Sequence, residues 1–130
     1  MRRPGRRGSN AVEFALLMPL FVALLVGTME YGWYFGQEAT LGNAVRQGAR
    51  AGAVAQAGQD PVARAQHATA QVLQEAGFTG TVHVEAAVDG SAPDQLLVVS
   101  AWAPYHPLAG LMPAPVRMQS RSAVRLESQP

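Results

Sequence analysis

The sequence predicts an α+β protein in which a long N-terminal helix precedes a second helix and a small three-stranded antiparallel sheet. Three observations predict this class: sixteen uncharged, mostly apolar residues between Glu13 and Glu30, a helical repeat over residues 62–76, and three strand-like segments after residue 79. The 130 residues include no cysteine and 15% charged residues. This composition allows one small domain with an appended segment, and it excludes a multidomain enzyme and a disulfide scaffold.

The basic charge lies in the first residues of the chain. All ten basic residues are arginines, and four of them stand at Arg2, Arg3, Arg6 and Arg7. Without residues 1–8, six arginines would face nine acidic residues, and the formal net charge would change from +1 to −3. A nucleic-acid partner is therefore disfavoured, because binding to phosphates needs a basic face on the folded part.

The apolar run is long enough to cross a membrane. A helix from Ala11 to Phe35 would be about 37 Å long, against a hydrocarbon core of ~30 Å. The arginines before it predict a cytoplasmic N-terminus, and the aromatic cluster at 31–35 would lie at the opposite interface. The expected organisation is a basic leader at 1–8, a transmembrane helix at 9–36, its extracytoplasmic continuation at 37–55, and an α+β domain at 56–130.

Three interpretations of this segment compete: a cleaved secretory signal, a signal anchor and the core helix of a soluble protein. A secretory signal is disfavoured because the carboxylate of Glu13 stands at the entrance of the run and no small-x-small cleavage site follows it closely. The leader arginines and the length of the run disfavour a soluble core helix. Pro19 removes one backbone donor, which membrane helices tolerate.

Glu13 has two interpretations. It either marks the inner boundary of the span, or it pairs with a positively charged amine that cleavage of the chain creates. Cleavage after Gly8 would make Ser9 the new N-terminus and place Glu13 at the fifth position. The amine of Ser9 and a carboxylate on a shifted neighbouring helix would then neutralise each other and set the register between subunits.

The order of a basic leader, a glycine, four residues, Glu-Phe and an apolar helix (RRG-SNAV-EF-ALLMPLFVALLVG) resembles the signal of type IV pilins and pseudopilins. The stretch from Ala11 to Leu20 (AVEFALLMPL) is similar to the TadE-like family of minor pseudopilins from tight-adherence (Tad, or Flp) pilus systems. The segment from Asn43 to Ala51 (NAVRQGARA) is similar to a second block of that family. Together these motifs cover residues 7–54.

This resemblance implies a function in pilus biogenesis, assembly or surface adhesion, with no enzymatic activity and no cofactor. It implies cleavage between Gly8 and Ser9 by a prepilin peptidase, and a register and assembly role for Glu13, Phe14 and Pro19. The implied partners are that peptidase, other Tad pilins and pseudopilins, an inner-membrane assembly platform and the membrane, but no nucleic acid. The chain would cross the bacterial inner membrane once, with its C-terminal domain in the periplasm or in an extracellular pilus.

Small residues recur every four positions beyond the apolar run. The row comprises Thr28, Gly32, Gly36, Thr40, Ala44, Gly48 and Gly52. Such rows let another helix backbone approach closely, which predicts helix packing at the glycines and at Ala44. Accidental composition is the alternative. Because steps of four wind around a straight helix, only two or three consecutive members can face one neighbour.

The charges near this row are candidates for ion pairs between subunits. Arg46 and Arg50 lie one turn apart, and Glu30 and Glu38 lie upstream. A solvated helix face is the favoured alternative, because exposed pairs contribute little to stability.

The remainder of the chain predicts one helix and three strands. Asp60 and Pro61 provide an N-cap and a first-turn proline, and Gly77 ends the helix. Alternation over 79–88 and 116–127 predicts two half-buried strands, and the apolar segment 95–103 predicts the central strand. The proline-rich loop 104–115 is apolar. Its Leu108, Leu111 and Met112 either cover the sheet, which the small domain favours, or form an exposed patch facing another subunit or the bilayer.

Catalytic and metal-binding patterns are weak. The histidines at positions 67, 83 and 106 are widely spaced, no cysteine is present, and no nucleophile or phosphate-binding motif occurs. The sequence therefore predicts an interaction protein and no metal site. The competing hypothesis is an uncleaved, signal-anchored periplasmic binding module that captures a ligand on the face of Arg117, Arg121 and Arg125.

Overall fold

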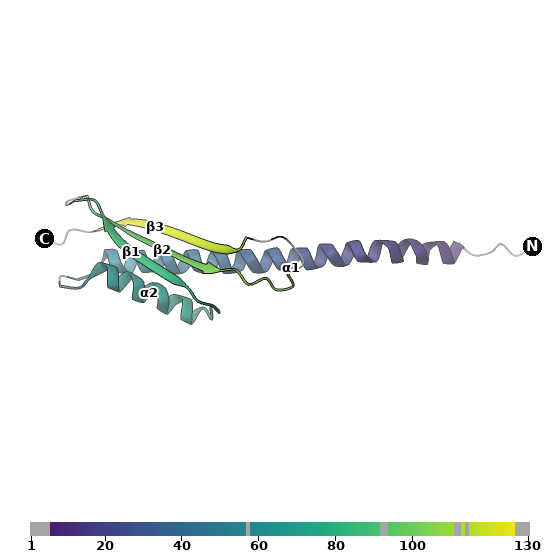
Figure 1. Cartoon of the computed structure of the whole chain (residues 1–130), viewed down its shortest axis with the longest axis horizontal. Helices are drawn as coiled ribbons and strands as arrows, with labels where there is room; N and C mark the ends of the chain where they lie inside the picture. The colour runs from purple at the N-terminus through teal and green to yellow at the C-terminus, as the bar shows by residue number, and fades with distance from the viewer. Residues whose placement is uncertain (1–5, 57, 92–93, 111–112, 114, 127–130) are drawn as a thin grey trace, which may run out of the picture. The chain divides into compact units, whose positions relative to one another are not determined.

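The computed structural model describes residues 6–56, 58–91, 94–110, 113 and 115–126. The element order is α1 (Arg6–Ala53), α2 (Pro61–Glu75), β1 (His83–Asp89), β2 (Leu96–Pro104) and β3 (Arg117–Arg125) (Figure 1). The predicted α+β class, with a long apolar N-terminal helix, a second helix and an antiparallel three-stranded sheet, is confirmed.

The chain forms two compact units. The first comprises Met1–Trp33 and Pro107–Ala114, and the second comprises Tyr34–His106 and Pro115–Pro130. The loop between β2 and β3 therefore belongs largely to the unit of the N-terminal helix, and the sheet and α2 belong to the other unit.

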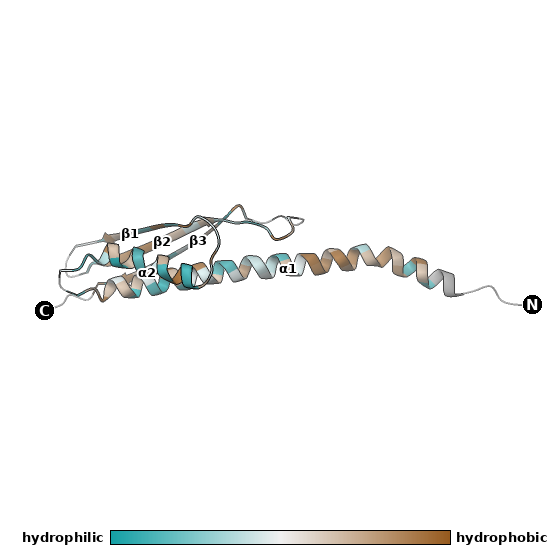
Figure 2. Ribbon diagram, turned by 90° about the horizontal axis from the view of Figure 1, so that it is seen from below, coloured by the Kyte–Doolittle hydropathy of each residue, from teal (hydrophilic) through white to brown (hydrophobic). Residues whose placement is uncertain are grey.

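Helix α1 has 48 residues, about 72 Å at 1.5 Å per residue, and continues through Pro19. Its hydropathy changes along its length, from an apolar first half to a more polar second half (Figure 2). Only 6% of the most apolar stretch is buried. By length and composition, α1 is able to cross a membrane and is compatible with a single-pass anchor.

The sheet is an antiparallel meander in the order β1-β2-β3. His83 pairs with Trp102 at one end of the first ladder, and Leu97 of β2 pairs with Val124 of β3. Strand β2 lies in the centre of the sheet, as its apolar sequence predicts. Its residues 97, 99, 101 and 103 are buried on one face, whereas the other face is only partly covered. In β3 the even-numbered residues 118–124 face inward and the arginines face outward, as the alternation predicts.

The core of the second unit lies between the inner face of the sheet, the second half of α1 and α2. Small side chains of α1 allow the close packing, since Ala44 and Ala49 are completely buried together with Leu41 and Val45. The other buried members are Ala53, Ala65, Thr69, Leu73, Leu97, Val99, Ala101, Ala103, Tyr105 and Met118. The hydroxyl of Thr69 donates to the carbonyl oxygen of Ala65 at 2.8 Å, so this buried polar group is satisfied.

The ends of α2 follow the predicted chemistry. The Oδ1 atom of Asp60 accepts a hydrogen bond from the amide of Val62 at 2.9 Å, and Pro61 opens the helix. At the other end Gly77 has φ +66°. The amide of Phe78 donates to the carbonyl oxygen of Leu73 at 3.0 Å, which is the bond that closes a Schellman motif.

The observed bounds of all three strands differ from the predicted ones by one or more residues, and the start of β1 differs most. Strand β1 begins at His83 and not at residue 79. Because His83 pairs with Trp102, two more residues would bring the strand opposite Pro104, which has no amide hydrogen for the ladder. Val116 was expected on the inner face of the last strand, but it precedes β3 and is 87% exposed. Strand β3 ends at Arg125, with Leu126 already outside it, so the strand ends earlier than predicted; Glu127 itself lies outside the described residues.

Candidate functional site

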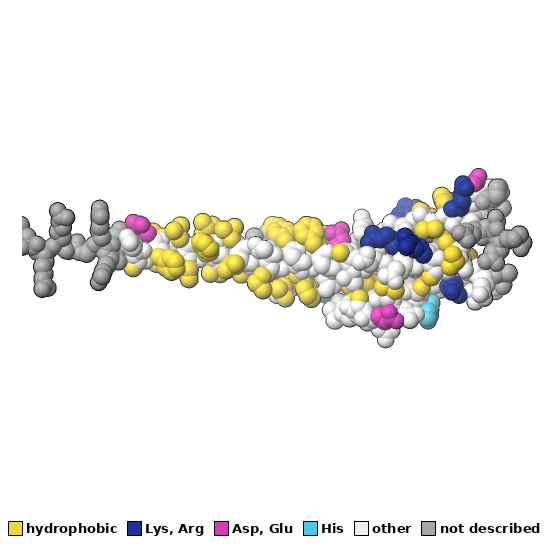
Figure 3. Space-filling model, turned by 180° about the vertical axis from the view of Figure 1, so that it is seen from behind, with side chains coloured by type: hydrophobic (Ala, Val, Ile, Leu, Met, Phe, Trp, Pro, Cys, Tyr) yellow, Lys and Arg dark blue, Asp and Glu magenta, His cyan; other side chains and the backbone are white. Residues whose placement is uncertain are grey.

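The first half of α1 exposes its apolar side chains. Leu16 is 74% exposed and Phe21 is 63% exposed. Other large side chains at least half exposed in this stretch are Val12, Phe14, Leu17, Leu20, Val22, Leu24, Leu25 and Met29. The space-filling view shows apolar side chains along this part of the helix (Figure 3). An apolar surface of this kind marks a membrane or protein contact.

The predicted processing and register residues lie at the start of this surface. Gly8 and Ser9 are in the first turn of α1, and Glu13 and Phe14 are exposed one turn further on. Pro19 lies within the uninterrupted helix. Cleavage at Gly8 and a register role for Glu13, Phe14 and Pro19 concern other molecules, so they stay predictions.

The row of small residues has different surroundings along α1. A Cβ atom added at Gly32 or Gly36 would meet no atom within 4 Å. At Gly48 it would clash with the Thr69 hydroxyl and lie 2.8 Å from the carbonyl oxygen of Ala65. At Gly52 it would clash with the Leu97 side chain and lie 2.7 Å from the carbonyl oxygen of Pro61.

Gly48 and Gly52 therefore allow the backbone of α2 and the Leu97 side chain on the inner face of the sheet to approach α1 closely. Ala44, a third position predicted for helix packing, is completely buried in the same core. Whether Gly32 and Gly36 contact another subunit stays a prediction.

The arginines of the second half of α1 are exposed. The Nη2 atom of Arg46 donates to Oδ1 of Asn43 at 2.6 Å, one turn earlier on the same helix, and Arg50 is exposed near the end of α1. Ion pairs of Glu30, Arg46 and Arg50 with another subunit stay predictions.

Glu30 is the acidic residue with the most unusual surroundings. It is 1% exposed, and its two carboxylate oxygens accept backbone hydrogen bonds from the β2–β3 loop. The amide of Leu108 donates to Oε1 at 2.9 Å and the amide of Ala109 donates to Oε2 at 2.8 Å. The hydroxyl of Tyr31 donates to the carbonyl oxygen of Pro113 at 3.4 Å. All of these residues belong to the first compact unit. This contact was not predictable from the sequence, because 78 residues separate Glu30 from Leu108.

The loop itself is exposed at Leu108. This side chain is 56% exposed, so the expectation that Leu108 covers the sheet is wrong. The segment instead packs in the unit of the N-terminal helix, where the carboxylate of Glu30 holds its backbone. Leu111 and Met112, which shared that expectation, lie outside the described residues.

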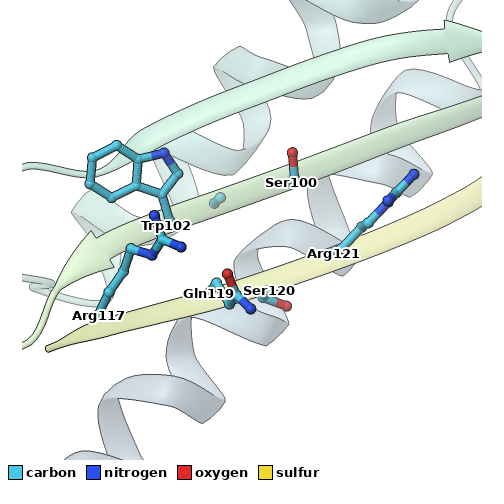
Figure 4. Close-up of a pocket in the computed structure, with 7 residues that line it drawn as sticks. Ser100, Trp102, Arg117, Gln119, Ser120 and Arg121 are labelled. Atoms are coloured by element: carbon cyan, nitrogen blue, oxygen red, sulfur yellow. The ribbon is translucent and has the colours of Figure 1, made fainter. Parts of the chain in front are cut away.

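The outer face of the sheet carries an aromatic and cationic cluster. The rings of His83 and Trp102 stack with their centroids 3.9 Å apart and 12° between their planes. The guanidinium carbon of Arg117 lies 5.6 Å from the centre of the Trp102 ring, within the range of a cation–π contact. In the close-up, Arg117 reaches toward Trp102 and Arg121 extends away from it (Figure 4). The sequence placed His83 on the outer face but could not supply the register that stacks it on Trp102.

Two shallow hollows flank this cluster. One, of about 480 Å³, is lined by residues of β2 and β3 that include Trp102, Arg117 and Arg121. The other, of about 460 Å³, is lined by Gln66, Glu85, Ala86, Ala87, Val98, Ser100 and Arg121. Of the three arginines on this face, Arg125 forms an exposed ion pair with Asp94 at 2.5 Å. Within the described ranges, no group of three or more His, Asp and Glu residues could hold a metal ion.

Comparison with known proteins identifies the N-terminal region. The family model of TadE-like proteins matches residues 8–50, which begin at the predicted cleavage glycine and end near the close of α1. The predicted resemblance to the TadE-like family is confirmed, and it associates the chain with the Tad pilus system. The comparisons with curated proteins and with solved structures found no match.

Proposed function

We propose that this chain is a minor pseudopilin of a tight-adherence pilus system, anchored in the bacterial inner membrane by the first half of α1. It is cleaved after Gly8 by a prepilin peptidase, exposes its folded unit outside the cytoplasm and acts in pilus biogenesis, assembly or surface adhesion. The match to TadE-like proteins over residues 8–50 supports the pilus system. The remaining steps rest on the chemistry of α1.

The main observation behind this proposal is that the first half of α1 exposes its apolar side chains. Only 6% of the most apolar stretch is buried, although the stretch continues into a helix whose second half is packed in a core. Each large apolar side chain left in water forgoes about 1.5–3 kcal/mol of burial free energy. Insertion into a bilayer, followed by packing against the helices of other pilins, removes this surface from water.

The assembly step uses the acid at the start of that surface. Cleavage after Gly8 gives Ser9 a free amine four residues before Glu13. A carboxylate inside an apolar helix bundle is tolerated when it is paired, so the amine of one subunit and Glu13 of its neighbour would fix the axial shift between them. Partners of the helix are the other pilins and pseudopilins and the inner-membrane assembly platform.

Intact-mass spectrometry of the membrane-extracted protein tests the processing step. In a host with the prepilin peptidase, the mass should correspond to a chain beginning at Ser9. Gly8→Leu should retain the full leader, whereas Ala11→Leu, which adds the same bulk beyond the cleavage site, should be trimmed normally. A trimmed mass in a strain that lacks the peptidase would refute the proposal.

Shearing of pili tests the assembly step. The native chain should appear in, or co-purify with, the sheared pilus fraction. Glu13→Ala should lower its amount there without lowering the amount in the membrane. Glu38→Ala removes an acid from the same helix beyond the apolar run and serves as the matched control. Equal amounts of all three proteins in the pilus fraction would contradict a register role for Glu13.

A second function is favoured by the outer face of the sheet. The hollow at Trp102, Arg117 and Arg121 suits a ligand of an anchored periplasmic binding module. Such a protein needs no processing, so its membrane form would keep residues 1–8 in a host that has the peptidase. The mass measurement on the native chain therefore separates the two functions.

A further inference from the structure

The loop segment Pro107–Gly110 is fastened to α1 at the point where the apolar run ends. Glu30 is the first charged residue after that run, and it holds two consecutive backbone amides of the segment at 2.9 and 2.8 Å. Tyr31 and Trp33 follow it at once, and they are 41% and 43% exposed. At 1.5 Å per residue, Trp33 is only about 4.5 Å further along the helix axis than Glu30. The loop and the exposed aromatic side chains therefore lie at the same level of α1.

The contact is strong enough to define the position of the segment. A buried carboxylate is stable only when hydrogen bonds replace its hydration, and bonds to a charged acceptor are stronger than neutral ones. Glu30 accepts one such bond at each oxygen. If the loop separated from the helix, the carboxylate would lose both of these donors, which is unfavourable for a buried charge. The carboxylate thereby fixes the backbone at Leu108 and Ala109 against α1.

This arrangement leaves an apolar side chain exposed. Leu108 is 56% exposed even though its own amide is used in the contact with Glu30. Residues 107–110 (PLAG) carry no charged side chain. Aromatic residues next to an apolar helix collect at the lipid headgroup level, where polar backbone and apolar side chains are both accommodated.

We propose that Pro107–Gly110 is a membrane-surface contact, in which Leu108 enters the boundary between headgroups and acyl chains of the outer leaflet and Glu30 holds the segment in place. This inference rests on the proposed anchoring of α1 in the membrane. The lipid surface is favoured over a second copy of the chain because the segment shares its compact unit with the apolar helix. It is also level with the aromatic residues that follow the apolar run. The contact sets how far α1 emerges from the bilayer.

A single fluorescent probe tests the contact. The chain has no cysteine, so Leu108→Cys provides a unique thiol for an environment-sensitive nitrobenzoxadiazole label. The full chain is reconstituted into vesicles of phosphatidylethanolamine and phosphatidylglycerol, with or without lipids that carry a quencher near the headgroup. Ala63→Cys, at an exposed position of α2, carries the same label as the matched control.

The probe at position 108 should emit at shorter wavelength than the probe at position 63 and should lose most of its fluorescence to the quencher lipids. A chain that floats with the vesicles but leaves both probes in water would overturn the inference and keep the anchoring. A blue shift that depends on the protein-to-lipid ratio, without quenching by lipid, would assign the segment to a second copy and also overturn it. Failure to float would refute the anchoring and the inference together.

Removal of the carboxylate tests the role of Glu30. In the labelled Leu108→Cys chain, Glu30→Ala should reduce quenching by the lipids, because the loop loses its two acceptors. Glu30→Gln keeps one acceptor oxygen and should give an intermediate value, whereas Glu38→Ala should leave quenching unchanged. Equal quenching in all four proteins would show that Glu30 does not hold the loop at the membrane surface.

Discussion

Substitution of Gly48 by alanine should destabilise the folded unit although alanine is the better helix former. The added Cβ would clash with the Thr69 hydroxyl and lie 2.8 Å from the carbonyl oxygen of Ala65, which belongs to the α2 backbone and cannot rotate away. Overpacking of this kind costs about 1–3 kcal/mol, and a position that meets backbone is expected in the upper part of that range. The higher helix propensity of alanine offsets about 0.5–1 kcal/mol of this cost. The net loss is therefore roughly 1–2 kcal/mol.

Thermal unfolding of the full chain in detergent, followed by circular dichroism, measures this loss. For a domain of this size, 1–2 kcal/mol lowers Tm by roughly 5–15 °C. Gly36→Ala is the matched control, because its Cβ meets no atom within 4 Å and its Tm should stay the same or rise. In a Thr69→Ala background the loss caused by Gly48→Ala should shrink, since the clashing hydroxyl is gone. A Gly48→Ala protein at least as stable as the native chain would refute the close approach of α1 and α2.

Three further outcomes are expected. Asp60→Ala should lower Tm by roughly 4–8 °C, because it removes an N-cap hydrogen bond that contributes about 1 kcal/mol. Asp60→Asn should keep most of this stability, because asparagine is also a good N-cap. Equal Tm values of the two variants would contradict the cap. Asp94→Ala should leave Tm nearly unchanged, because its ion pair with Arg125 is solvent-exposed, and a large fall would show a structural role for that pair. Trp102→Ala should move the NMR signals of the His83 ring by removing the stacked aromatic ring, and unchanged signals would contradict the stacking.

Local chemistry explains which parts of the fold were predictable. Asp60 and Gly77 act through hydrogen bonds to residues close in the sequence, and Pro61 acts through its fixed φ, so the bounds of α2 can be read from the sequence alone. The central position of the 96–104 segment was also predictable from its composition, because a long apolar strand without charged residues is typical of the middle of a sheet and not of its exposed edge.

Contacts between distant residues were not predictable in the same way. The stacking of His83 on Trp102 depends on the register between β1 and β2, and a shift by one residue would move every side chain to the other face. The hydrogen bonds of Glu30 depend on where the β2–β3 loop returns to α1, and no repeat or spacing in the sequence specifies that position. The exposure of Leu108 follows from the same contact, which is why the expectation of a covering loop failed.

The helical repeat also determines which glycines of α1 face the rest of the chain and which face a neighbouring subunit. Each step of four residues turns about 40° beyond a full turn, so Gly36 and Gly52 face directions about 160° apart on a straight helix. Gly52 admits the carbonyl oxygen of Pro61 at 2.7 Å from its Cβ position, whereas nothing lies within 4 Å of that position at Gly36. A neighbouring helix that used Gly36 would therefore approach α1 from the side opposite to the Gly52 contact with Pro61. Packing within the chain and packing between subunits can then use the same row of small residues without competing for one face.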